Sequence, residues 1–353
     1  MEDQPLEMPF LRNVGLVVTY RCQVACPHCI IEAGPHRKEE VRTDDALGWI
    51  HQLAKYREGY VKVLSLTGGE PFYNLTLLKR LAEYGRNCGL FVSAVTNAFW
   101  ATTREAALKV IRDFSEIGMF AFSTDVYHQI SIPFERVKNA ILAARECGIP
   151  YNIAVCTENE HQEEFKAILD NLRQITEDET IVTTVTFPAG RALRKIGILR
   201  HQLTSEAPVA ACTAGSSPII FPDGRVIACI GPVIDLRSPH PLVLGSLRES
   251  SLEEIFDRAE TNAILHAIRI WGPKKLIAMI EEAGLGRNLP EKYIRNSVCN
   301  ACYSLMENEE IVQFLEVLAN DSNLIEKVAY ARLYYLNEKR MLELAGVAAN
   351  LQS

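Results

Sequence analysis

The sequence predicts an α/β protein built on parallel strands, and two observations carry that prediction. Apolar, β-branched runs alternate with amphipathic stretches about every 30 residues, the period of a βα unit. Runs such as Val61–Leu66 are apolar almost throughout, as a parallel sheet covered on both faces requires. Six such units fit a doubly wound sheet or a partial barrel, and the period alone does not separate the two.

The elements follow in order along the chain. The expected strands are Val14–Tyr20, Val61–Thr67, Phe91–Thr96, Met119–Thr124, Tyr151–Cys156 and Ile181–Phe187. The expected helices are Asp44–Tyr56, Leu75–Asn87, Arg104–Ile117, Phe134–Glu146 and His161–Ile175. Gly118 and Gly148 stand where two of these helices are expected to end.

The alternation stops after Gly197, so we place a domain boundary near residue 200. Residues 204–250 are rich in Ser, Pro and Gly, and Ile219–Ile227 is expected to form a hairpin around Pro222-Asp223-Gly224-Arg225. The last fifty residues are expected to form one or two long helices. We therefore predict a core over 1–198, a second domain over 199–305 and a helical segment over 306–353.

Composition excludes several classes of protein. The 353 residues are 48% hydrophobic and 23% charged, which excludes global disorder. The 37 basic and 44 acidic residues give a net charge of −7, which argues against nucleic acid bound by a basic surface. No apolar run approaches the roughly 18 residues of a membrane span, and no signal peptide is recognisable. We expect a cytoplasmic protein without membrane or nucleic-acid partners.

Three of the ten cysteines form the first motif. Cys22, Cys26 and Cys29 have the spacing C-x3-C-x2-C, directly after the first strand. Three thiolates on one loop can hold three corners of an iron–sulfur cube and leave the fourth iron open. An open metal position distinguishes a reactive site from a structural one. The alternative is a zinc site that uses His28, which lies within the motif.

A glycine-rich turn follows the second strand. Gly68-Gly69-Glu70-Pro71 lies at the carboxyl end of that strand, where two glycines let the backbone approach a ligand closely. The peptide groups and the Glu70 carboxylate are suited to bind an amino group.

Together the two motifs resemble the radical S-adenosylmethionine (radical SAM) superfamily over residues 14–190. The resemblance implies a partial (βα)6 radical SAM barrel. It implies that Cys22, Cys26 and Cys29 hold a [4Fe–4S] cluster whose open iron binds SAM. It also implies that Gly68, Gly69, Glu70 and Pro71 hold the methionine end of SAM, and that His28 lies near the adenine.

Further polar residues stand at the carboxyl ends of other strands, where ligands lie in parallel α/β folds. Asn97 follows the third strand, Ser123 and Asp125 end the fourth, and Arg191 follows the sixth. The resemblance makes them candidates for binding SAM, with substrate as a further ligand for Arg191. Asn97 and Asp125 could instead cap the next helices.

A second set of cysteines lies in the C-terminal part. Cys212 and Cys229 flank the expected hairpin, and Cys299 and Cys302 form a CxxC motif. Four thiolates can close a zinc site or a cubane. The spacing resembles the start of a SPASM extension, but no cysteine follows Cys302. This departure implies the shorter twitch form, a β-hairpin plus helix with one auxiliary [4Fe–4S] cluster, expected to relay electrons or to shape the site.

Three residues on the reactive face are candidates for catalysis. Cys156 ends the fifth strand, and a thiol there could return a hydrogen atom to a substrate radical, with core packing as the alternative. Tyr127 and His128 follow Asp125 and could contact substrate or accept a proton, with a merely hydrogen-bonded histidine as the alternative. Cys88 and Cys147 precede glycines at helix ends and are expected to be buried small apolar residues.

The resemblance implies an enzyme that splits SAM into methionine and a 5′-deoxyadenosyl radical, which takes a hydrogen atom from a substrate C–H bond. The electron donor would be of the flavodoxin or ferredoxin type. We expect a ribosomal peptide or natural-product precursor as substrate, which is oxidised, cross-linked or epimerised.

Two other functions stay open. One is a dehydrogenase or epimerase of a sugar-like or aminocyclitol small molecule. In its favour, only 21 residues precede Cys22, which is expected to leave no room for a leader-binding domain. The other is a non-catalytic iron–sulfur scaffold or electron carrier, which would not need the Gly-Gly-Glu turn.

Overall fold

The computed structural model describes residues 9–196, 200–338 and 341. The chain divides into two compact units. One unit, here called the sheet unit, comprises Asn13–Gln202 and Ile219–Arg225. The other, the C-terminal unit, comprises Met1–Arg12, Leu203–Pro218 and Val226–Ser353. The three domain ranges expected from the sequence stay a prediction.

Strands and helices alternate along the sheet unit. They are β1 (Asn13–Thr19), α1 (Thr43–Lys55), β2 (Val63–Gly68), α2 (Leu75–Asn87), β3 (Phe91–Thr96), α3 (Arg104–Asp113), β4 (Ile117–Ser123), α4 (Phe134–Glu146), β5 (Tyr151–Thr157), α5 (Glu163–Arg173), β6 (Ile181–Val185), α6 (Arg191–Lys195) and β8 (Ile219–Ile220). All six predicted strands are present. The bounds of β3, α2 and α4 are those predicted.

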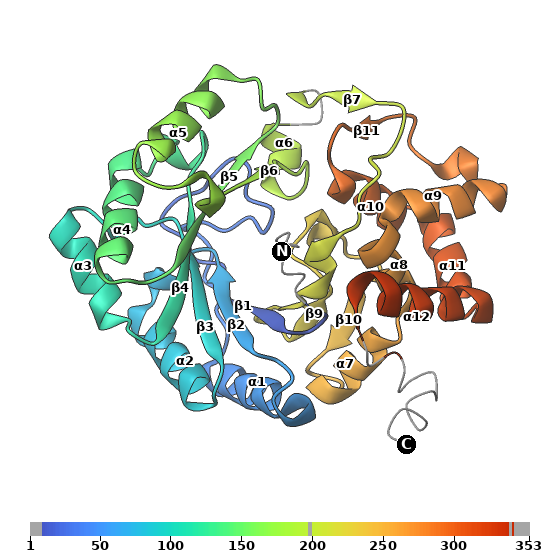
Figure 1. Ribbon diagram of the computed structural model, residues 1–353, viewed down its shortest axis with the longest axis horizontal. Coiled ribbons are helices and arrows are strands. Elements are labelled where there is room, and N and C mark those ends of the chain that lie inside the picture. Colours follow the sequence, from blue (N-terminus) through green and yellow to red (C-terminus); the bar gives the residue numbers. More distant parts are fainter. Residues whose placement is uncertain (1–8, 197–199, 339–340, 342–353) are drawn as a thin grey trace. The chain divides into compact units, whose positions relative to one another are not determined.

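The strands of this unit form one parallel sheet in the order β8-β1-β2-β3-β4-β5-β6. Helices α1 to α5 line the outer side of this curved sheet (Figure 1). Within the described residues β6 pairs only with β5, so the sheet is not closed. The predicted α/β class with a partial, open barrel is therefore confirmed.

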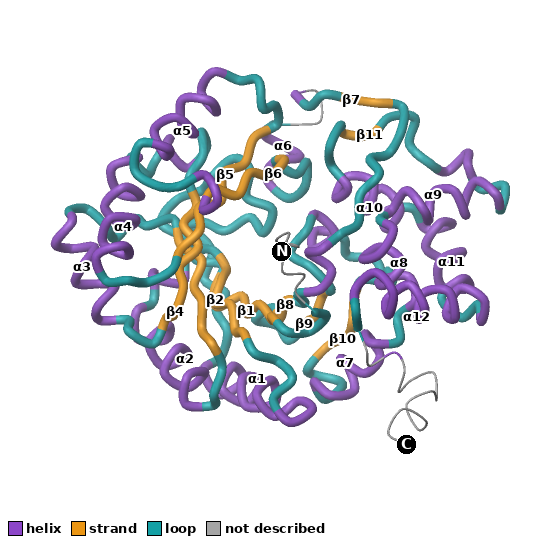
Figure 2. Tube along the Cα trace, viewed as in Figure 1, coloured by secondary structure: helices purple, strands orange, loops and turns teal. Residues whose placement is uncertain are grey.

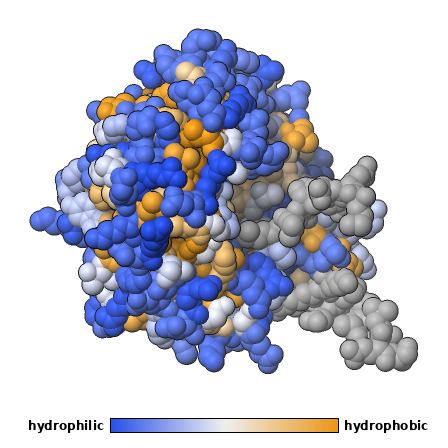
Figure 3. All heavy atoms as spheres, turned by 60° about the vertical axis from the view of Figure 1, so that its left-hand side comes forward, coloured by the Kyte–Doolittle hydropathy of each residue, from blue (hydrophilic) through white to orange (hydrophobic). Residues whose placement is uncertain are grey.

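Buried and partly exposed residues largely alternate along β2, β3 and β5, so one face of the sheet is buried more fully than the other, whereas β1 is buried on both faces. Leu64, Leu66, Phe120 and Phe122 on β2 and β4 are fully buried. Burying a side chain of this size contributes about 1.5–3 kcal/mol. The side of the molecule shown in Figure 3 is mainly hydrophilic, with a band of hydrophobic residues across it.

Two glycines predicted to end helices have different roles. Gly148 follows α4 with a φ of 65° and ends that helix as predicted. Gly118 lies inside β4, so that prediction was wrong, as was the extension of α3 to Ile117. A Cβ atom on Gly118 would stand 2.5 Å from the Phe91 ring, so the glycine makes room for a neighbouring strand's side chain.

The C-terminal unit is mostly helical (Figure 2). Its elements are β7 (Leu203–Thr204), β10 (Val243–Ser246), α7 (Leu252–Glu260), α8 (Ala263–Trp271), α9 (Pro273–Glu282), β11 (Tyr293–Ile294), α10 (Val298–Glu307), α11 (Glu309–Leu318) and α12 (Ser322–Leu336). Strand β9 (Arg225–Ile227) starts at the last residue of the sheet unit. The predicted hairpin is confirmed, because the Phe221 amide donates to the Arg225 carbonyl at 2.9 Å.

The prediction of one or two long C-terminal helices was wrong. Asn308 and Asp321 interrupt the helical pattern, because their side chains cap new helices. The Asn308 side chain accepts a hydrogen bond from the Ile311 amide at 3.1 Å, and the Asp321 carboxylate accepts one from the Leu324 amide at 2.7 Å. Among the described residues no helix combines the length and the apolar character that crossing a membrane requires.

The end of β2 lies directly against the chain that follows β1. The Gly69 amide donates to the Thr19 carbonyl at 2.7 Å, and the Glu70 amide donates to the Arg21 carbonyl at 2.9 Å. A Cβ atom on Gly69 would stand 2.3 Å from the Arg21 carbonyl oxygen. On Gly68, which has a φ of 141°, it would stand 2.4 Å from the Thr19 oxygen. Both glycines are therefore required by this contact alone.

We predict that Gly69→Ala lowers the free energy of unfolding by about 1–3 kcal/mol, the usual cost of forcing atoms into a packed site. Gly48→Ala is the matched control, since it lies in α1 with nothing within 4 Å of the added atom. It should stabilise the chain by roughly 0.5–1 kcal/mol. Urea unfolding of the metal-free protein measures both, and equal effects of the two variants would contradict the contact.

Candidate active site

The loop after β1 gathers the three cysteines of the first motif. Cys22 and Cys26 are buried in one cluster with Val24, and Cys29 packs against it. Burial raises the pKa of Cys22 and Cys26 to about 12. A bound cation would favour the thiolate forms at this place, because burial removes the water that would otherwise stabilise three negative charges.

The cysteine loop, residues 20–42, is fastened to the start of α6. Arg191 donates from Nη1 to the Cys26 carbonyl and from Nη2 to the Ala33 carbonyl, both at 2.7 Å, and its amide donates to the Cys29 carbonyl at 3.1 Å. A Cβ atom on Gly190 would stand 2.2 Å from the Ile30 carbonyl oxygen. The positive charge of Arg191 lowers the pKa of all three thiols, against the larger opposing effect of burial.

Glu70 is completely buried behind the glycine turn. Its carboxylate accepts hydrogen bonds from the Phe72 amide at 3.1 Å, from Thr96 Oγ1 at 2.9 Å and from the Asn97 amide at 2.8 Å. Burial raises the pKa of Glu70 to about 7, although these hydrogen bonds act in the opposite sense. A cationic amino group brought to Glu70 would favour its charged form.

Asn97 connects Glu70 with the cysteine loop. Its Nδ2 lies 3.7 Å from Cys22 Sγ, and its Oδ1 accepts from Gln23 Nε2 at 2.8 Å. The side chain does not cap a helix, since α3 is capped by Thr103. Cys22, the glycine turn and the end of β3 are thus joined by hydrogen bonds.

Asp125 brings together most of the other predicted residues. Its Oδ1 accepts from the Tyr127 and His128 amides, each at 2.9 Å. Its Oδ2 lies 2.8 Å from His128 Nδ1, 3.0 Å from Cys156 Sγ and 3.5 Å from His28 Nε2. The Asp125 carboxylate therefore contacts residues of the cysteine loop, of the end of β4 and of the end of β5.

The titratable groups around Asp125 have shifted pKa values. Burial would raise the pKa of Asp125, but the charge and hydrogen bond of His128 outweigh it and lower that pKa. Conversely, burial would lower the pKa of His128, and Asp125 raises it above the usual value. Burial lowers the pKa of His28 to about 4, and burial with the Asp125 charge raises that of Cys156 well above normal. Cys156 is therefore a protonated thiol at neutral pH.

His28 has the partners expected of a residue that lines a ligand site. Its ring stacks on Tyr127 with 4.9 Å between centroids and meets the His128 ring edge-on at 4.8 Å. Its Nδ1 is buried and has no hydrogen-bond partner among the described residues. Ser123 is half-buried at the end of β4, and Pro71 is buried in the first position of the turn after Glu70.

The four cysteines of the second set come from three places within the C-terminal unit. Cys212 precedes a short turn, Cys229 follows β9, and Cys299 and Cys302 lie in the first turns of α10. Burial raises the pKa of Cys229 and Cys299 to about 12, and the charge of Cys212 adds to the shift of both. The mutual effects of these thiols indicate that they face one region.

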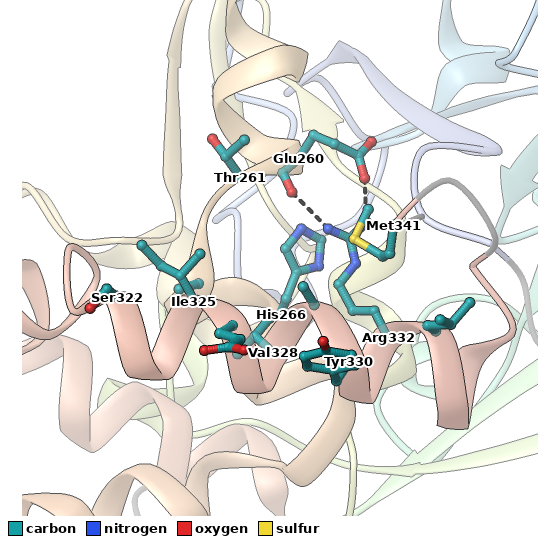
Figure 4. A pocket seen from close by; sticks show the side chains of 13 residues that line it. Glu260, Thr261, His266, Ser322, Ile325, Val328, Tyr330, Arg332 and Met341 are labelled. Atoms are coloured by element: carbon teal, nitrogen blue, oxygen red, sulfur yellow. Dashed lines mark hydrogen bonds and ion pairs between the residues drawn. The ribbon is translucent and has the colours of Figure 1, made fainter. Parts of the chain in front are cut away.

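An ionic network that the sequence did not predict lies on α8 and α12. Arg269 donates to Ser216 Oγ at 2.9 Å and pairs with Glu338 at 2.7 Å. Arg332 pairs with Glu338, and it also pairs with Glu260 beside a cavity of about 560 Å³, where Figure 4 shows these two residues. The signal was present in the sequence, since Arg269 is a charge within the apolar run of α8.

Arg269 also affects the second cysteine set. Its charge lowers the pKa of Cys212, although burial has the larger effect and raises it. The Cys212 amide donates to the Ile268 carbonyl at 3.1 Å, which places this cysteine beside α8.

Cys88 and Cys147 are half-buried at the C-terminal ends of α2 and α4. The expectation that they are buried was wrong, because a helix end exposes the residue that precedes its terminal glycine.

The first site fits an iron–sulfur cluster with one open position. Its donors are three thiols from a single loop, a set that could ligate three irons of a cubane. A buried carboxylate and an unpaired His28 nitrogen lie next to it, and both suit an organic ligand with an amino group and a hydrogen-bond donor. These observations agree with the cofactors expected from the motifs.

Residues 16–172 match the family described as the Radical SAM superfamily. This part of the chain belongs to that superfamily. The chain thus contains a radical SAM domain, and the family implies an enzyme that uses SAM and a [4Fe–4S] cluster. Its C-terminal extension is consistent with the SPASM type.

Three proteins that resemble this chain are distant in sequence. The chain is 20% identical over 308 residues to the "Putative peptide biosynthesis protein YydG" of Bacillus subtilis (strain 168), covering 86% of this chain and 94% of that protein. A crystal structure of BtrN in complex with AdoMet and 2-DOIA matches 74% of this radical SAM chain and 89% of its own, with a TM-score of 0.39 and 13% identity. HydG, a maturase of the [FeFe]-hydrogenase, matches over 93% and 83%, with a TM-score of 0.39 and 13% identity.

We predict that Cys26→Ala removes one [4Fe–4S] cluster and abolishes formation of 5′-deoxyadenosine, because a site with two thiolates no longer holds the cubane. Cys147→Ala is the control, since this cysteine is half-buried at the end of α4. Iron and sulfide analysis of anaerobically reconstituted protein, with chromatography of the SAM products, measures the difference. Retention of wild-type iron by Cys26→Ala would contradict the ligand set.

Proposed function

We propose that this enzyme modifies a peptide and that its reaction is an epimerisation in which Cys156 returns the hydrogen atom. One observation carries the proposal. The Cys156 thiol lies 3.0 Å from Asp125 and has a pKa well above normal, so it keeps its hydrogen next to the residues that surround the cysteine loop. The name of YydG, a protein similar along most of its length, supports a peptide as substrate.

When bound, SAM and the cluster supply a 5′-deoxyadenosyl radical, which removes a hydrogen atom from an unactivated C–H bond. The chain's own residues determine the fate of the substrate radical. Cys156 donates the hydrogen atom of its S–H bond to the substrate carbon from its own side, and a new C–H bond forms. The sulfur then needs one electron, from an iron–sulfur or flavin donor protein, and one proton to become a thiol again.

Asp125 positions this thiol. Its Oδ2 accepts the S–H hydrogen, and its Oδ1 is held by two backbone amides, so the sulfur has a fixed place. The negative charge of Asp125 also opposes loss of the proton from Cys156. Tyr127 and His128, which Asp125 holds, are proposed to contact the substrate.

A second candidate outcome is oxidation or cross-linking, and the four-cysteine set favours it. We propose that Cys212, Cys229, Cys299 and Cys302 bind an auxiliary [4Fe–4S] cluster. A fully ligated cluster can accept an electron from a substrate radical. The substrate is then no longer a radical, so it does not take a hydrogen atom from Cys156. The other proposed partner is a flavodoxin- or ferredoxin-type donor, in a cytoplasmic setting.

Replacement of Cys156 separates the two outcomes. In D2O the exchanged thiol should deliver one deuterium, so the peptide product gains about one mass unit and contains a D-residue. Cys156→Ala should lower D-residue formation at least about 100-fold while 5′-deoxyadenosine still forms, because hydrogen abstraction does not need this thiol. The substrate for the test is a synthetic peptide whose sequence is taken from any short reading frame found next to the gene, and Cys147→Ala serves as the control.

Two results would overturn epimerisation. One is a product two mass units lighter than the substrate, which indicates oxidation. The other is a Cys156→Ala variant that still forms the D-residue at the wild-type rate.

Cys302→Ala tests the auxiliary site. It should reduce the iron content below the wild-type value of about eight atoms per chain, because the auxiliary site loses one of the four thiolates that close it. SAM cleavage should persist, whereas any oxidation or cross-linking of the peptide should stop. An unchanged iron content, or zinc in the wild-type protein, would contradict an auxiliary iron–sulfur cluster.

A further inference from the structure

Arg191 has an unusual set of partners for an arginine. Both of its terminal nitrogens donate to backbone carbonyls of the cysteine loop, those of Cys26 and Ala33. Its own amide donates to the Cys29 carbonyl. These three contacts fall before, at and after the third cysteine, so this one residue fixes the loop on both sides of that ligand.

Close packing leaves the loop little freedom at this point. Gly190 has a φ of 57°, and a Cβ atom on it would overlap the Ile30 carbonyl group. One turn further along α6, Arg194 forms an ion pair with Glu32 of the same loop. The start of α6 therefore packs against the cysteine loop through several neighbouring residues.

The charge of Arg191 is not neutralised by a carboxylate partner in the part of the chain that the structure describes, since its hydrogen bonds all go to peptide carbonyls. The carboxylates of Glu70 and Asp125 act on the thiols in the opposite sense. In a site with little water, charges interact much more strongly than at the surface. The single positive charge of Arg191 therefore has a large effect on the electrostatic potential at the three thiolates.

We propose that Arg191 is a positioning residue that holds the cysteine loop in place and provides the positive charge that sets the reduction potential of the three-thiolate site. Reduction adds one negative charge, and a nearby cation stabilises the reduced state. This inference rests on the family assignment and is independent of the peptide substrate and of Cys156. It also gives Arg191 a different role from the contact with SAM or substrate expected from the sequence.

The test compares Arg191→Met, Arg191→Lys and, as control, Arg194→Met, each reconstituted anaerobically as full-length protein. Electron paramagnetic resonance follows a redox titration without SAM, and the part of the signal that changes when SAM is then added identifies the cluster with the open iron. At one fixed potential, Arg191→Met should lower the ratio of reduced to oxidised cluster about tenfold, which is about 59 mV for a one-electron couple. Arg191→Lys, which keeps the charge, should lower it less than about threefold.

Arg194 is 63% exposed, so Arg194→Met should match the wild type within error. Circular dichroism and iron analysis accompany each titration. If Arg191→Met folds but loses the iron, the positioning role is supported, and Arg191→Lys then decides the role of charge. Wild-type iron content and potential in both Arg191 variants would overturn the proposal. So would an unchanged potential together with weaker SAM binding, which would make Arg191 a ligand of SAM.

Discussion

The active site depends on backbone contacts that only glycine permits. At Gly68 and Gly69 the end of β2 touches the chain after β1, and at Gly190 the start of α6 touches the cysteine loop. A side chain at any of these positions would meet a peptide carbonyl at 2.2–2.4 Å. The loop carries three thiols whose charged forms are costly to bury, and a loop that moved freely would not hold them together. The three thiols therefore stay together as one set of donors only because the backbone around them is held in place.

Side chains at the carboxyl ends of the strands lie next to this fixed backbone and form the rest of the candidate active site. Asp125 is the centre of this group of side chains, because its two oxygens accept from two amides and lie near two imidazoles and a thiol. A buried carboxylate keeps its charge only with such partners. The partners are in turn oriented by it, so the thiol of Cys156 and the rings of His28 and His128 have defined places. Loss of this carboxylate would release residues from three different strands or loops.

The sequence predicted the parts of this site that depend on local pattern. Cysteine spacing, the glycine turn and polar residues after apolar strands are local signals, and the parallel sheet brings them to one edge. The sequence offered two roles for Asp125, capping of the chain that follows and a place in the ligand site, and its contacts fit both. Its Oδ1 accepts from the following backbone amides, and its Oδ2 faces the site. Gly118 was misjudged because its reason lies in Phe91, a residue of another strand. The carbonyl partners of Arg191 are also far from it in the sequence, and so is Glu260 from Arg332. No local sequence pattern therefore predicts these contacts.

The two cysteine sets differ in the charge that their nearby arginine contributes. Arg269 near Cys212 is paired with Glu338, so much of its charge is offset inside the C-terminal unit. Within the described residues, the Arg191 side chain near the first set donates only to peptide carbonyls, so its charge stays available to the thiolates. An added electron is stabilised by an unpaired cation and much less by one that already has a carboxylate partner. The same residue type thus favours reduction at the open three-thiolate site, where an electron must enter to split SAM, and has less influence at the site that four thiols can close.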